Sequence, residues 1–168
     1  MSAVLAREVD AIQNPAMSAV LLWRFCVGYG SARGTPSSTP LPALFVALPI
    51  LFNEESFTLL SSTQVKSGLR LFAGKFTEAA HSKTDVLLSI ERQAKTLRGQ
   101  TLEALRLGLQ SRLLFLEPRA AEVIALSEAA PKSLPESVRP LVRNADKLGA
   151  LAGAVSLFEL GTVLQITF

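Results

Sequence analysis

The sequence predicts a mainly α-helical protein of the α+β class, with a winged helix-turn-helix-like core and additional helices towards both ends. Segment 95–126 contains a short helix with one apolar stripe, followed by two β-prone runs that a proline-containing turn separates. A helix that leads directly into a hairpin is the order in which a winged helix-turn-helix ends. The length of 168 residues suits one domain with one core. We therefore expect a single domain over residues 1–168, with its winged-helix-like core at about 63–126.

The first predicted helix begins at Asn14. This residue suits the N-cap, and Pro15 suits the first helical position. Apolar residues then recur at helical spacing, and Gly28 fits the C-terminal end of the helix. We expect Arg24 and Tyr29 to lie towards the edge of the buried surface.

A segment rich in Ser, Thr, Pro and Gly follows at 31–40, and we interpret it as a flexible surface loop. The next run, Leu41–Phe52, is 12 residues long and is interrupted by prolines, so it is too short to cross a membrane, which needs about 20 residues. It is apolar nearly all round, which predicts a helix at the centre of the core or against another chain. Pro49 should bend or end this helix, and the polar residues 53–55 close it.

Three further helices are predicted before the hairpin. The first covers 64–80, with Leu69, Phe72 and Phe76 on one face. The second covers 85–97 and the third 100–110, with Gly99 at the turn between them. The third helix should place its leucines on one side and Glu103, Arg106 and Gln110 on the opposite stripe.

The two β-prone runs, 113–117 and 122–126, form the predicted wing, with a tight connection at 118–120. A proline-rich loop at 129–140 then precedes a helix at 141–152. Ser156 is followed three residues later by Glu159, a capping-box pattern that predicts a last helix at 157–165.

No pattern of catalytic or metal-binding residues is present. The chain has one cysteine, Cys26, and one histidine, His81, which excludes an internal disulfide, the common zinc frameworks and most histidine-based triads. Cys26 suits a buried thiol on a helix, and His81 suits a solvated helix boundary. The glycines after the first helix do not have phosphate-loop spacing, and no GxSxG motif exists. We expect no enzyme activity, no cofactor and no metal.

The net charge is +3, and the basic residues are concentrated in one region. Between Lys83 and Arg112 there are six basic and three acidic residues. The candidates for DNA contact in and near the predicted wing are Arg98, Arg106, Arg112 and Arg119. However, Glu103 would face phosphates unfavourably. A winged helix that docks on proteins is therefore favoured, and direct DNA contact stays open.

The composition is 49% hydrophobic and only 18% charged, with a mean hydropathy of +0.34. Because no run is long enough to span a membrane, these values favour a soluble, cytoplasmic protein that buries surface against partners.

An ordered set of motifs covers residues 14–168. These motifs are NPAMSAVLLWRFCVGY, LPALFVALPILFNEE, GLRLFAGKF, LRGQTLEALRLGL with its hairpin, and DKLGALAG with ELGTVLQITF. Together they resemble the middle component of three-component ABC systems (ABC-3C), a group that includes Lamassu-type defence modules.

The resemblance implies a non-catalytic adaptor that bridges an SMC/Rad50-like ABC ATPase and an effector protein, often a nuclease, in a bacterial defence complex. DNA is a further expected partner of the complex, and no membrane is involved. The candidates for partner contact are four aromatic residues: Trp23, Tyr29, Phe45 and Phe52. The alternative is a stand-alone winged-helix transcription regulator that binds DNA.

Overall fold

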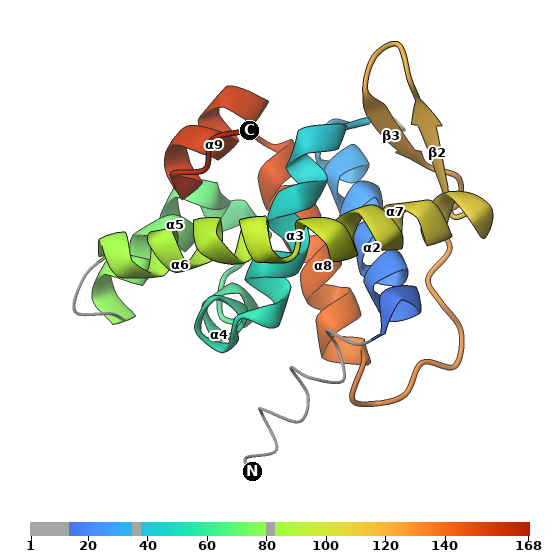
Figure 1. Cartoon of the computed structure of the whole chain (residues 1–168). Coiled ribbons are helices and arrows are strands. Elements are labelled where there is room, and N and C mark those ends of the chain that lie inside the picture. Colours follow the sequence, from blue (N-terminus) through green and yellow to red (C-terminus); the bar gives the residue numbers. More distant parts are fainter. Residues whose placement is uncertain (1–13, 35–37, 80–82) are drawn as a thin grey trace.

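The computed structural model of the chain describes residues 14–34, 38–79 and 83–168 (Figure 1). In these residues the fold is mainly helical with a small three-stranded antiparallel sheet, which confirms the predicted class. The α-helices are α2 (Pro15–Ala32), α3 (Leu44–Phe52), α4 (Glu54–Ser61), α5 (Gly68–Ala79), α6 (Lys83–Thr96), α7 (Arg98–Gln110), α8 (Arg139–Gly153) and α9 (Leu157–Leu164). The strands are β1 (Thr39–Pro40), β2 (Leu114–Glu117) and β3 (Glu122–Ala125). Short 3-10 helices, Leu41–Ala43 and Val65–Ser67, precede α3 and α5.

Helices α2 and α8 pack against each other along most of their lengths and lie at the centre of the molecule. Asn14 caps α2 as predicted, since its Oδ1 accepts a hydrogen bond from the backbone N–H of Met17 at 3.1 Å. The helix does not end near Gly28 but runs on to Ala32. Gly28 is a contact point instead, because a Cβ atom there would lie 2.0 Å from the carbonyl oxygen of Asp146 in α8. Gly28 is therefore a point where two backbones approach closely. In the sequence alone, the same glycine resembles a helix end.

Arg24 is buried, contrary to the expectation that it lies at an edge, with 7% of its surface exposed. Its Nε and Nη2 donate to the two carboxylate oxygens of Asp146 at 2.8 and 3.0 Å, and its Nη1 donates to the carbonyl of Glu128 at 3.1 Å. The neighbouring Trp23 donates from Nε1 to the carbonyl of Ser127 at 2.7 Å. The hydrogen bonds of Arg24 offset the cost of burying its charged guanidinium group. They also fix the segment after β3 to the central helix pair.

Helix α3 crosses the core and is almost entirely buried, as its apolar composition predicts. Pro49 does not end it, since the helix continues to Phe52. The polar residues that follow start a helix that the sequence analysis missed, α4. Asn53 is its N-cap and accepts a hydrogen bond from the backbone N–H of Ser56 at 3.0 Å.

No single helix within the described residues is both long enough and apolar enough to cross a membrane. Two pairs of consecutive helices meet those criteria only when they are taken together, and they are bent by 95° and 113°.

Helices α6 and α7 lie end to end across the front of the molecule (Figure 1). The break between them is at Leu97 and not at Gly99, which lies in the first turn of α7. The N–H of Leu97 donates to the carbonyl of Gln93 at 2.7 Å, and the N–H of Thr101 donates to the carbonyl of Leu97 at 2.8 Å, so helical bonding passes through the break. Helix α6 packs on α3 and α5, whereas α7 packs mainly on α2. The winged-helix description of this region stays a prediction.

The hairpin follows α7 directly, as predicted, with Leu114 opposite Ala125 and Glu117 opposite Glu122. Strand β1 adds a third, edge strand that pairs with β3, giving the order β1-β3-β2. The predicted flexible loop at 31–40 therefore begins inside α2 and ends in a strand, while residues 35–37 lie outside the described part of the chain.

The last two helices follow the predicted order. Helix α8 begins slightly earlier than expected, at Arg139, with Pro140 in its first turn rather than before it. Ser156 caps α9 as predicted, because its Oγ accepts a hydrogen bond from the backbone N–H of Glu159 at 3.1 Å.

Candidate interaction surfaces

The residues that the structure describes contain no group of three or more His, Cys, Asp or Glu side chains that could hold a metal ion. His81 lies outside the described residues. Cys26 is buried, and burial raises the pKa of its thiol to about 12. A thiol with that pKa is protonated at neutral pH and is a poor nucleophile. The informative features of the molecule are therefore its surfaces.

Three of the four aromatic residues expected to contact partners belong to the core of this chain. Trp23, Tyr29 and Phe52 expose 5%, 1% and 6% of their surface, so a partner cannot reach them in this conformation. Tyr29 was also expected to lie towards the edge of the buried surface, and it is buried instead. Phe45, in α3, is half-buried. These helices are apolar on nearly every side, so the sequence does not show which of their side chains remain exposed.

The four arginines predicted to contact DNA are all exposed, but only two of them lie on the same element. Arg98 and Arg106 lie two turns apart on α7, Arg112 follows α7 with a positive φ of 56°, and Arg119 lies in the turn between β2 and β3. Arg106 already forms hydrogen bonds to both carboxylate oxygens of Glu103, at 2.9 and 2.5 Å. The predicted stripe of Glu103, Arg106 and Gln110 thus exists, and part of its positive charge is neutralised.

The outward side of the hairpin carries carboxylates and apolar groups. Because directly opposite residues share a face, Phe115 lies beside Ile124, and Glu117 lies beside Glu122. Leu114 is turned inward against α7. Phe115 is 47% exposed. We call this surface, made by Phe115, Ile124, Glu117 and Glu122, the wing face. Two adjacent carboxylates would repel DNA phosphates, so the wing face is better suited to a protein.

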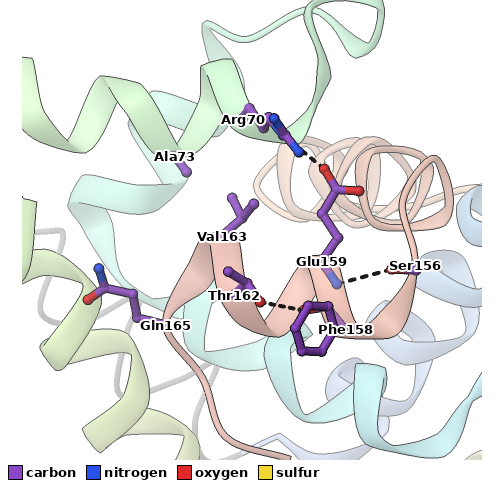
Figure 2. A pocket seen from close by; sticks show the side chains of 8 residues that line it. All are labelled: Arg70, Ala73, Ser156, Phe158, Glu159, Thr162, Val163 and Gln165. Carbon is purple, nitrogen blue, oxygen red and sulfur yellow. Dashed lines mark hydrogen bonds and ion pairs between the residues drawn. The ribbon is translucent and has the colours of Figure 1, made fainter.

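A groove of about 600 Å³ lies between α5 and α9 (Figure 2). We call it the α5–α9 groove; the residues that line it are Arg70, Ala73, Ser156, Phe158, Glu159, Thr162, Val163 and Gln165. Val163 of α9 points towards Ala73 of α5. Arg70 Nε donates to Glu159 Oε1 at 2.9 Å and thereby links the two helices.

Phe158 is the most exposed large apolar side chain in the described residues, at 83%. Leu160 and Leu164 of the same helix are buried, and their helical spacing fixes which side of α9 faces the core. Phe158 lies off that stripe and projects from α9 beside the groove (Figure 2). The sequence analysis did not identify it. The sequence does contain the information that Phe158 is exposed. The capping residue Ser156 determines where the helix starts, and Leu160 and Leu164 determine its buried side.

A known protein family matches nearly the whole chain. The model of the family described as ABC-three component (ABC-3C) system Middle Component 3 matches residues 2–168. No curated protein and no solved structure matches the chain.

Proposed function

Because the chain belongs to the ABC-three component (ABC-3C) system Middle Component 3 family, we propose that it is a non-catalytic adaptor between two other components of such a system. In this proposal one partner is an SMC/Rad50-like ABC ATPase and the other is an effector protein, a nuclease. The assembly is a cytoplasmic, Lamassu-like defence complex that acts against phages or plasmids. The family description supports the presence of partner components, and the identities of the ATPase and the effector are our proposal.

The observation that supports the bridging role is the presence of two separate surfaces that expose apolar side chains. The wing face exposes Phe115, and the α5–α9 groove lies beside the exposed Phe158. The hairpin and α9 lie apart from each other, at the upper right and the upper left of Figure 1. Exposed apolar patches commonly mark interaction sites, and aromatic side chains often dominate the binding energy at such sites. An adaptor that holds two partners at once needs two such surfaces that do not overlap.

DNA contact has a secondary place in this proposal. Glu117 and Glu122 lie side by side on the wing face, and Arg106 is paired with Glu103. A main role as a DNA reader, as in the stand-alone regulator, would favour a wing and helix free of such carboxylates.

Co-expression with the products of the adjacent genes tests the proposal. The chain carries an affinity tag, and the components that purify with it are identified. Phe115→Ser and Phe158→Ser are compared with Val65→Ser, which changes an apolar residue of similar exposure to Phe115 outside both surfaces. We expect each of the first two variants to lose a different component and the Val65 variant to lose none.

Two results would contradict the bridging role. If both variants lost the same component, the two surfaces would serve one partner. If the wild-type chain purified alone and bound one promoter fragment specifically, it would be a stand-alone regulator.

A further inference from the structure

Helices α6 and α7 carry two stripes of residues on opposite sides. The inner stripe is buried against the rest of the protein and consists of Leu87, Ile90, Leu97, Ala104 and Leu105. The outer stripe is exposed and consists of Leu88, Arg92, Lys95, Gly99, Leu102 and Arg106. Because helical bonding passes through Leu97, the outer stripe forms one continuous surface roughly 27 Å long.

The outer stripe has the spacing with which one helix packs beside another. Its members alternate at intervals of three and four residues, the repeat that forms the seam of coiled coils and of helix bundles. Leu88 and Leu102 lie two heptads apart on the same line and are 48% and 47% exposed. About half of the surface of each leucine is therefore accessible to a partner.

The charge of the outer stripe indicates the chemistry of what covers it. Its three charged members, Arg92, Lys95 and Arg106, are all positive. Lys95 contacts Glu91 at 3.0 Å, and Arg106 contacts Glu103, but ion pairs as exposed as these are weak and can be replaced by pairs with a partner. Arg92 forms no ion pair with any residue that the structure describes. A complementary surface would place carboxylates opposite these cations and apolar side chains opposite the leucines.

We propose that the outer stripe of α6 and α7 binds an acidic, leucine-bearing α-helix of another component of the system. This inference rests on the proposed adaptor function and adds the chemistry of one partner surface. A DNA duplex would also supply negative charge, but it would leave Leu88 and Leu102 facing phosphates.

The test uses the full chain co-expressed with the other components. Arg92→Glu combined with Arg106→Glu reverses two charges of the stripe, and Leu102→Ser removes one apolar contact. The matched control combines Lys66→Glu with Arg143→Glu, two exposed basic residues on other elements. We expect the charge reversal to lower the recovery of one component by about tenfold, because like charges then face each other. The control should recover every component at the wild-type level, and all variants should melt cooperatively.

A photo-cross-linking residue at Leu102 then identifies the contacted segment. We expect cross-links to a helical segment with acidic residues in a heptad pattern, and replacing those residues by Lys should restore recovery with the reversed chain. If the reversed chain recovers all components, this inference is wrong and the adaptor function stands. If assembly is intact and only retention of a DNA duplex is lost, the stripe is a DNA surface and the inference is also wrong. If the wild-type chain recovers no component, the adaptor function itself fails.

Discussion

Replacing Gly149 by Ala should destabilise the protein strongly, because this glycine lies where α8 touches α2. A Cβ atom at Gly149 would lie 2.1 Å from the carbonyl oxygen of Phe25 and 2.8 Å from the backbone nitrogen of Tyr29. Both contacts are with backbone, so no side chain can rotate away to relieve them. The two helices would have to move apart by about 1 Å to bring even the closest contact to 3.0 Å. That movement loosens the packing of the core on both sides of the contact.

The magnitude follows from two opposing effects. Overpacking a core costs about 1–3 kcal/mol and sometimes more, and a contact between two backbones should reach or exceed the upper end of that range. Alanine favours a helix over glycine by about 1 kcal/mol, which offsets part of the loss. We therefore expect a net loss of about 2–3 kcal/mol and a decrease in Tm of about 4–12 °C for a chain of this size.

Gly74→Ala is the matched control, because Gly74 also lies inside a helix but has no atom within 4 Å of the position that an added Cβ would take. Only the gain in helix propensity remains there, so this variant should be more stable by up to about 1 kcal/mol. Urea unfolding followed by circular dichroism measures both variants. A Gly149→Ala protein as stable as the wild type would show that α2 and α8 do not approach as closely as described.

Three further predictions concern single side chains. Arg24→Met should lower stability by about 2 kcal/mol, less than the about 3–5 kcal/mol of a fully buried pair, because the Asp146 side chain is 35% exposed. Burial raises the pKa of Asp146 and Arg24 opposes this increase, so the Arg24→Met variant raises that pKa further. The decrease in Tm relative to the wild type should therefore be larger at neutral pH than in acid, where Asp146 is protonated in both proteins. Cys26, the one cysteine of the chain, should not react with a chromogenic disulfide reagent at mildly alkaline pH until the protein unfolds, because burial raises its pKa to about 12. A fast reaction of the folded protein would contradict the burial of this thiol. Phe158→Ser should change stability by less than about 0.5 kcal/mol because the side chain is 83% exposed, and a large decrease in Tm would show that Phe158 packs on the protein.

The features that the sequence predicted well depend on neighbouring residues. The cap at Asn14 and the cap at Ser156 each join residues three positions apart, and the hairpin joins two adjacent strands. Local hydrogen bonding of this kind is encoded by the residues that take part in it, so a pattern is enough to find it.

Helix α4 was missed although its cap at Asn53 is local, but the other missed features depend on contacts between distant segments. Strand β1 forms only because Thr39 pairs with Val123, and Arg24 is buried only because Asp146 lies opposite it. Gly28 resembled a helix end because its contact with α8 is invisible in the sequence. The burial of Trp23, Tyr29 and Phe52, three of the expected partner contacts, was missed for the same reason. Aromatic residues of helices that are apolar all round were selected, whereas Phe158, on a helix with a clear buried side, was overlooked.

The contact between α2 and α8 also determines the mutual geometry of the two partners in the proposed complex. Helix α8 leads through a short turn into α9 and the groove, and β1 of the sheet is the next strand after α2 in the chain. Glycines hold the two helices backbone to backbone, so one helix cannot slide along the other without a steric clash. In the proposed complex the subunit would then act as a spacer of fixed length. A partner on the wing face and a partner in the groove would keep a constant distance and rotation, and a movement of one partner would displace the other as a rigid body.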